Sequence, residues 1–73
     1  MKNIKLIRVT KDYTQLKVRM DTTISQSDIS KYEITDTYPT AQNLIILAKY
    51  YNVSTDFLLD LTDEQKPYPP KKK

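Results

Sequence analysis

Cysteine and histidine are both absent from this chain of 73 residues. Without cysteine, neither a disulfide framework nor a thiolate zinc site can hold a fold together. Without histidine, the chain lacks the commonest general base and the commonest metal ligand, so no nucleophile–base pair or metal cluster is expected. The sequence therefore argues against an enzyme, and it predicts neither a cofactor nor a metal site.

Glycine is absent as well. Turns that need a positive φ angle must then be built from Asp, Asn or Thr, which adopt that conformation at some cost in strain. We expect such strained backbone at Asp12, Thr23 and Thr35.

Long hydrophobic runs are missing too. The apolar run from Leu44 to Ala48 is far shorter than the ~20 residues that a membrane-spanning helix needs. The stretch from Met1 to Lys11 alternates charged and apolar residues, unlike a signal peptide. We expect a soluble, cytoplasmic protein without membrane contact, in one small domain that buries roughly 60% of its unfolded surface.

Charge is unevenly distributed. Seven basic and three acidic side chains give residues 1–31 a net charge of +4, whereas one basic and six acidic side chains give residues 32–65 a net charge of −5. Four lysines give residues 66–73 a net charge of +4. The division suggests one end that faces a polyanion, although small proteins also carry uneven charge for solubility alone.

Helix signals follow one another along the chain, and no stretch shows the sustained alternation of a strand. Four hydroxyl residues stand where a helix N-cap is expected: Thr14, Ser25, Thr40 and Ser54. The pattern predicts an all-α fold of five helices, near residues 4–11, 15–21, 26–33, 41–51 and 55–61. After Glu64 the sequence "QKPYPPKKK" predicts an extended, mobile tail over residues 66–73, so we place the domain at residues 1–65.

Residues 14–33, "TQLKVRMDTTISQSDISKYE", read as a single unit. Two capped helices flank a break at residues 22–24, and Val18, Ile24 and Ile29 are spaced to converge between them. This is the helix-turn-helix plan, in which the second helix lies in the major groove of DNA.

The outward side of that second helix, at residues 26–33, carries short hydrogen-bonding groups. Gln26 can pair with adenine, and Lys31 can donate to guanine or hold a phosphate. Ser27 and Ser30 can bind bases or backbone, and Lys17 on the preceding helix is a candidate phosphate contact. The alternative interpretation is an ordinary solvated helix face.

From Ile4 to Asp63 the sequence resembles the Cro and phage-repressor (lambda-repressor-like, or XRE) helix-turn-helix family. The resemblance rests on Ile4, Ile7 and Arg8, Thr14-Gln15, "ISQSDISKYE" at 24–33, "YPT" at 38–40, "LIILAKYYNVSTDFLL" at 44–59 and "LTD" at 61–63. It implies a compact five-helix DNA-binding domain of a transcriptional regulator that usually acts as a homodimer.

The resemblance also implies roles for individual residues. Gln26, Ser27 and Lys31 would face bases, and Gln15 would contact phosphate and brace Gln26. The other implied phosphate contacts are Ser25, Thr35 and Thr37. Ser30 is a further phosphate candidate because of its position on the second helix, not because of the resemblance.

Four departures from the family pattern stand out. Arg19 replaces a small residue at a close helix approach, and Thr22-Thr23 replaces the usual leucine and glycine of the turn. Ile34-Thr35 replaces an Asn-Gly pair, and Asp28 adds a negative charge to the recognition helix. We expect these departures to affect packing and DNA affinity rather than the fold.

Taken together, the sequence predicts a sequence-specific transcriptional regulator, a repressor, that binds a double-stranded DNA operator as a homodimer and takes no small-molecule ligand. Ile45 or Ile46 is a candidate dimer contact, because one helix face cannot bury the whole run from Leu44 to Leu47. The alternative is a protein-interaction module of the same fold, antitoxin-like or an anti-repressor partner, with weakened DNA binding. Asp28, Ile34 and the acidic second half favour that alternative.

Overall fold

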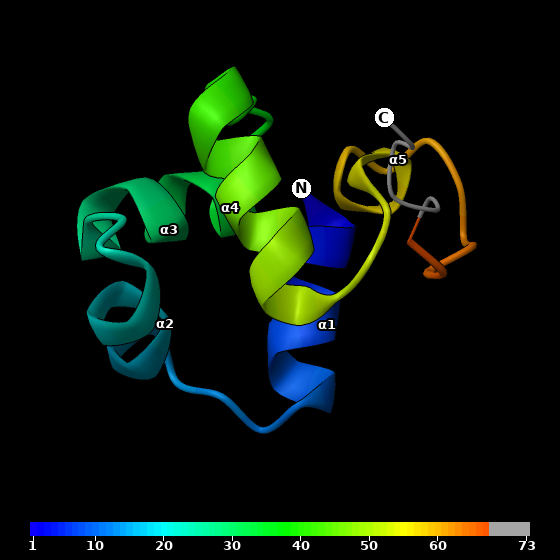
Figure 1. Ribbon diagram of the computed structural model, residues 1–73. Helices are drawn as coiled ribbons and strands as arrows, with labels where there is room; N and C mark the ends of the chain where they lie inside the picture. The colour runs from blue at the N-terminus through cyan, green and yellow to red at the C-terminus, as the bar shows by residue number, and fades with distance from the viewer. Residues whose placement is uncertain (68–73) are drawn as a thin grey trace, which may run out of the picture.

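The computed structural model describes residues 1–67, and the rest of the expected tail, residues 68–73, lies outside the described part. The described residues form five helices and no strand, which confirms the predicted all-α, lambda-repressor-like fold (Figure 1). The helices are α1 (Lys2–Thr10), α2 (Gln15–Thr22), α3 (Gln26–Ile34), α4 (Ala41–Tyr51) and α5 (Thr55–Leu58). No helix in this part of the chain is long and apolar enough to span a bilayer.

The four predicted caps are all in place. Thr14, Ser25, Thr40 and Ser54 each accept, through the side-chain oxygen, the backbone N–H of the third residue along. A hydroxyl in this position satisfies one of the N–H groups that a helix start leaves without an intrahelical partner. These caps explain why the starts of α2 to α5 could be read from the sequence.

The helix α1 begins differently, because its first N–H groups are bound by a residue near the other end of the fold. Asp60 Oδ2 accepts from the backbone N–H of Lys2 at 2.9 Å, and Asp60 Oδ1 accepts from that of Asn3 at 2.8 Å. The Asn3 amide in turn donates to the carbonyl of Phe57 at 2.9 Å. The chain therefore leaves α5 at Leu58, earlier than the predicted Leu61, and turns to cap α1.

Positive φ angles occur at four non-glycine residues within residues 1–67: Asp12, Thr23, Asn52 and Asp60, with values of 59°, 63°, 56° and 61°. The expectations for Asp12 and Thr23 are confirmed. The expectation for Thr35 is wrong, since this residue is extended, with φ at −110°. The last carbonyls of α3 are bound there by the chain's N-terminal amine and by Thr35 itself, so no left-handed residue is needed.

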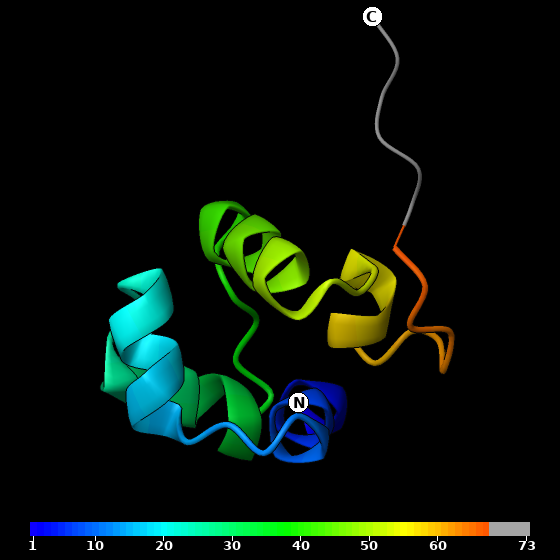
Figure 2. The ribbon, with the colours of Figure 1, turned by 60° about the horizontal axis from the view of Figure 1, so that its bottom comes forward.

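The core lies where the five helices meet. Val18, Ile24 and Ile29 are buried together, as the helix-turn-helix pattern predicted. Both views place α2 and α3 on one side and α5 on the other, with α1 and α4 between them (Figure 2). The other buried apolar residues are Met1, Ile4, Ile7, Tyr32, Leu47, Tyr51, Val53, Phe57 and Leu58.

The apolar run of α4 divides between core and surface. Ile46 packs against the core, whereas the side chain of Ile45 is 50% exposed. Of the two candidates for a dimer contact, Ile45 is therefore the accessible one.

Candidate nucleic-acid interface

The turn between α2 and α3 is built from threonines. Thr23 adopts the left-handed conformation, and its N–H donates to the carbonyl of Arg19 at 2.9 Å. The buried hydroxyl of Thr22 donates to the carbonyl of Val18 at 2.6 Å and accepts from the N–H of Ile24 at 3.3 Å. These bonds complete the turn without the leucine and glycine of the family pattern.

The α2 helix tolerates Arg19 because its side chain lies on the exposed surface, not at the helix contact. The side that packs on α3 is provided instead by Val18 and Thr22, which are 0% and 7% exposed. The substitution of a large residue for a small one therefore leaves the packing of these two helices intact.

The start of α3 combines a cap with an acidic first turn. Ser25 Oγ accepts the N–H of Asp28 at 3.1 Å, and the Asp28 carboxylate lies in the first turn, where it offsets the positive end of the helix dipole. The Ser25 hydroxyl keeps its own proton for donation, because a capping oxygen only accepts. Asp28 thus stabilises the helix end while reducing its attraction for phosphate.

The predicted base-reading side chains lie on one exposed side of α3. Gln26, Ser27 and Lys31 are exposed, while Ile29 and Tyr32 on the opposite side are 2% and 4% exposed. Ser30 is half-buried between the two sides. No part of the described chain covers the three polar side chains, so a groove of DNA can approach them.

Beyond α3, the two threonines expected at phosphate are tied into the link to α4. Thr35 Oγ1 donates to the carbonyl of Lys31 at 2.7 Å and accepts the N–H of Thr37 at 3.1 Å. The two hydroxyl oxygens lie 2.8 Å apart. Both residues are exposed, and the ordered link fixes their position relative to α3.

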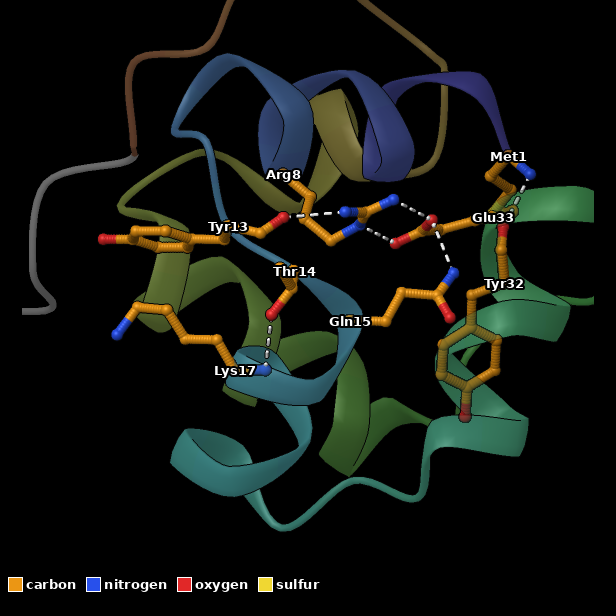
Figure 3. A network of polar contacts seen from close by, with 8 residues as sticks. All are labelled: Met1, Arg8, Tyr13, Thr14, Gln15, Lys17, Tyr32 and Glu33. Atoms are coloured by element: carbon orange, nitrogen blue, oxygen red, sulfur yellow. Dashed lines mark hydrogen bonds and ion pairs between the residues drawn. The ribbon is translucent and has the colours of Figure 1, made fainter.

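The N-terminal amine also reaches the end of α3. It donates to the carbonyl of Tyr32 at 2.6 Å (Figure 3). It also donates to the carbonyl of Thr35 at 2.8 Å. A positive charge at this end of a helix is favourable, because the helix dipole is negative there.

A buried ion pair joins α1 to α3 beside Gln15, the first residue of α2 (Figure 3). Arg8 Nε and one terminal nitrogen donate to the two Glu33 oxygens at 2.7 and 3.0 Å, and the other terminal nitrogen donates to the Tyr13 carbonyl at 2.7 Å. The hydrogen bonds with Glu33 raise the pKa of the Arg8 guanidinium. This pair was not predicted from the sequence. The pattern that could have revealed it is a charged residue one turn after a core residue in each helix: Arg8 after Ile4, and Glu33 after Ile29.

Gln15, a candidate phosphate contact, is half-buried beside this pair. Its amide nitrogen donates to Glu33 Oε1 at 3.1 Å, so its hydrogen bond goes to the carboxylate at the far end of α3. The expected bracing of Gln26 by Gln15 stays a prediction.

Lys17, the other candidate on α2, is engaged on the protein surface. Its ammonium lies 3.1 Å from Asp21 Oδ2 and 5.0 Å from the centre of the Tyr13 ring. The Tyr50 hydroxyl donates to the same Asp21 oxygen at 2.6 Å. The hydrogen bonds from Tyr50 and Lys17 lower the pKa of Asp21, which keeps it charged against Lys17.

Comparison with known proteins places the chain in a family. A family model described as "Helix-turn-helix domain" matches residues 1–64. This chain belongs to the XRE-like helix-turn-helix family. The match covers all five helices of the helix-turn-helix domain, including the Thr22-Thr23 turn and the α1 cap at Asp60.

One curated relative is the uncharacterized HTH-type transcriptional regulator YobD of Bacillus subtilis (strain 168). It is 41% identical to this helix-turn-helix protein over 44 residues, which are 60% of this chain and 39% of the relative. The match thus spans well under half of the relative's length. No solved structure matches the chain.

Proposed function

We propose that this protein is a sequence-specific DNA-binding transcriptional regulator that reads the major groove with α3. The observation that carries the proposal is the exposed polar side of α3, formed by Gln26, Ser27 and Lys31 opposite a fully buried side. Glutamine can bind adenine through two hydrogen bonds, and lysine can donate to guanine or phosphate. Membership of a helix-turn-helix family and the name of the curated relative support the same function.

Phosphate contacts would surround the base-reading side chains. Candidates come from the first half of α2, the cap and middle of α3, and the link that follows α3. They are Gln15, Lys17, Ser25, Ser30, Thr35 and Thr37. Such contacts fix the register of a protein on the duplex, whereas the base-facing residues supply the choice of sequence.

The regulator would act as a homodimer and as a repressor. A two-fold dimer would place two copies of α3 in successive major grooves about 34 Å apart, on a roughly palindromic operator. The half-exposed Ile45 supports a dimer contact through α4, because it lines a shallow, mostly apolar hollow of about 260 Å³ with Ala48 and Val53. A domain bound to an operator prevents other proteins from binding the same DNA, so repression needs no additional domain.

The test begins with selection of bound sequences from a pool of random duplexes. Replacement of Gln26 by alanine should then weaken binding to the selected operator by about 1–3 kcal/mol and relax the base choice at one position. Binding to random duplex should change little, because Gln26 is expected to touch bases rather than phosphates. Equal losses on operator and random DNA would show that Gln26 does not read a base.

A second candidate function is a protein-interaction module of the same fold. Exposed apolar side chains favour it: Leu6 and Val9 on the outer side of α1 are 47% and 56% exposed, and Ile34 at the end of α3 is 74% exposed. The two functions differ in their response to salt. Affinity for random duplex that falls steeply as salt rises supports the regulator, and absence of binding at low salt supports the interaction module.

A further inference from the structure

A carboxylate at the end of α3 holds the amide of Gln15 at the start of α2. Glu33 Oε1 accepts from Gln15 Nε2 at 3.1 Å, and both Glu33 oxygens accept from Arg8. The Glu33 side chain is 1% exposed and the Arg8 side chain is 13% exposed. Because the ion pair is bidentate and shielded from solvent, the two side chains are held in a fixed relative orientation. Arg8 also holds the Tyr13 carbonyl in the loop before α2, which fixes where α2 begins.

The chemistry of the carboxylate sets the orientation of the Gln15 amide. An ionised carboxylate only accepts hydrogen bonds, so Gln15 must turn its NH2 group, not its carbonyl oxygen, toward Glu33. That NH2 group has two hydrogens, and the second is left for another acceptor. The first backbone N–H groups of α2 lie beside it without intrahelical partners, and a helix start with such groups favours phosphate.

The charge of Glu33 does not oppose a phosphate at this place, because Arg8 balances it in the same buried pair. A lone carboxylate so close to the interface would repel the DNA backbone. The pair therefore provides a strong acceptor for Gln15 without adding net charge.

We propose that Glu33 is a positioning residue for DNA binding, which orients the Gln15 amide toward a phosphate of the bound duplex. The proposal rests on the proposed function and extends it to a buried residue that does not itself touch DNA. Glu33 thus affects the affinity for DNA through the orientation of Gln15, and not only through the stability of the fold.

A double-mutant cycle on random-sequence duplex tests the proposal. The variants are Gln15→Ala, Glu33→Gln and the combination, and each affinity is corrected for the folded fraction. Each single replacement should weaken binding roughly tenfold, as for a hydrogen bond to a charged group, and the combination no further. For Gln15→Ala, the slope of log affinity against log salt should stay unchanged, because a neutral amide releases no counterion.

Glu64→Gln is the matched control, since Glu64 is exposed and its replacement changes the net charge by the same amount. Where Glu33→Gln fails to fold, the paired replacement Arg8→Met with Glu33→Leu removes the acceptor without leaving a buried charge unpaired. The cycle is then formed by Gln15→Ala, this paired replacement and the combination of the two. If the losses of DNA affinity in the two single variants add up in the combined variant, the proposal is overturned.

A second measurement needs no DNA. In nuclear magnetic resonance spectra of the wild-type protein, the two side-chain amide protons of Gln15 should differ clearly in chemical shift. In Glu33→Gln this difference in chemical shift should become smaller. Unchanged Gln15 amide resonances overturn the proposal. If the wild-type protein does not bind duplex at all, the proposed function falls and this inference with it; if it binds and the losses add, the inference alone falls.

Discussion

Tyr51 places a polar group in the core that has no hydrogen-bond partner among the described residues. Its side chain is 1% exposed, and its hydroxyl is the buried side-chain atom left unpaired in that part of the chain. Replacement of Tyr51 by phenylalanine should raise the free energy of unfolding by about 1 kcal/mol, because the buried hydroxyl no longer has to leave water. Urea denaturation measures the change.

The matched control is Tyr32→Phe. The Tyr32 hydroxyl accepts from the Asn43 amide at 3.0 Å, so its removal should lower the free energy of unfolding by about 1 kcal/mol. A loss of stability in Tyr51→Phe would mean that its hydroxyl is paired after all.

The same tyrosine predicts a pH effect. Burial, and then the nearby Glu33 carboxylate, raise the pKa of Tyr51 well above its usual range. Above pH of about 10 the unfolded chain releases the phenolic proton while the folded protein keeps it, so unfolding becomes more favourable as the pH rises. Stability should thus be unaffected by this group below pH of about 10 and decline above it, and Tyr51→Phe should make the decline shallower.

Single residues also show which backbone features a sequence can reveal. Thr23 and Asp12 took positive φ angles as expected, because each follows a helix and must reverse the chain. Thr35 did not, since the groups that finish α3 include the amine of Met1, 34 residues earlier in the chain. A cap made by a distant residue leaves no local pattern.

At the scale of helices, α2 carries a lysine whose charge is partly neutralised. The Lys17 ammonium lies 3.1 Å from Asp21, one turn along the same helix. Asp21→Asn should strengthen binding to random duplex by roughly two- to fivefold, because it frees Lys17 and removes a negative charge near the backbone. Lys17→Ala should weaken binding to all sequences alike and reduce the salt slope by about one.

The control for Asp21→Asn is Asp63→Asn, an exposed acidic residue beyond α5 that changes the net charge equally. Affinities measured by fluorescence anisotropy over a series of salt concentrations separate the two. Equal gains in both variants would assign the effect to net charge, not to the release of Lys17.

The helices themselves were largely predictable, and so was the exposure of the polar side of α3. Hydroxyl caps and apolar spacing located the starts of α2 to α5, and the polar spacing of Gln26, Ser27 and Lys31 predicted the exposed side of α3. The length of α5 was not predictable. Asp60 lies outside the helix because it binds the first turn of α1 at Asn3, 57 residues earlier in the chain. The pairing of Arg8 with Glu33 escaped prediction for the same reason, since 25 residues separate them.

In the whole molecule, Asp60 closes the described chain into a ring: the segment after α5 is bonded to the start of α1. Asp60→Ala should lower the free energy of unfolding by about 1–2 kcal/mol, since it removes a helix cap and forces alanine into a left-handed conformation. Asp60→Asn tolerates that conformation and keeps one acceptor, so it should lose less. Thermal unfolding of the two variants gives the comparison, and equal losses would contradict the role of the cap.

The ring has a consequence for motion. The first turn of a helix usually frays, and its amide hydrogens then exchange with solvent long before the protein unfolds. Here the amides of Lys2 and Asn3 can open only when the segment after α5 is released as well. Deuterium uptake at these two positions should therefore be as slow as in the centre of the protein. The start of α1 and the segment after α5 should open in the same step.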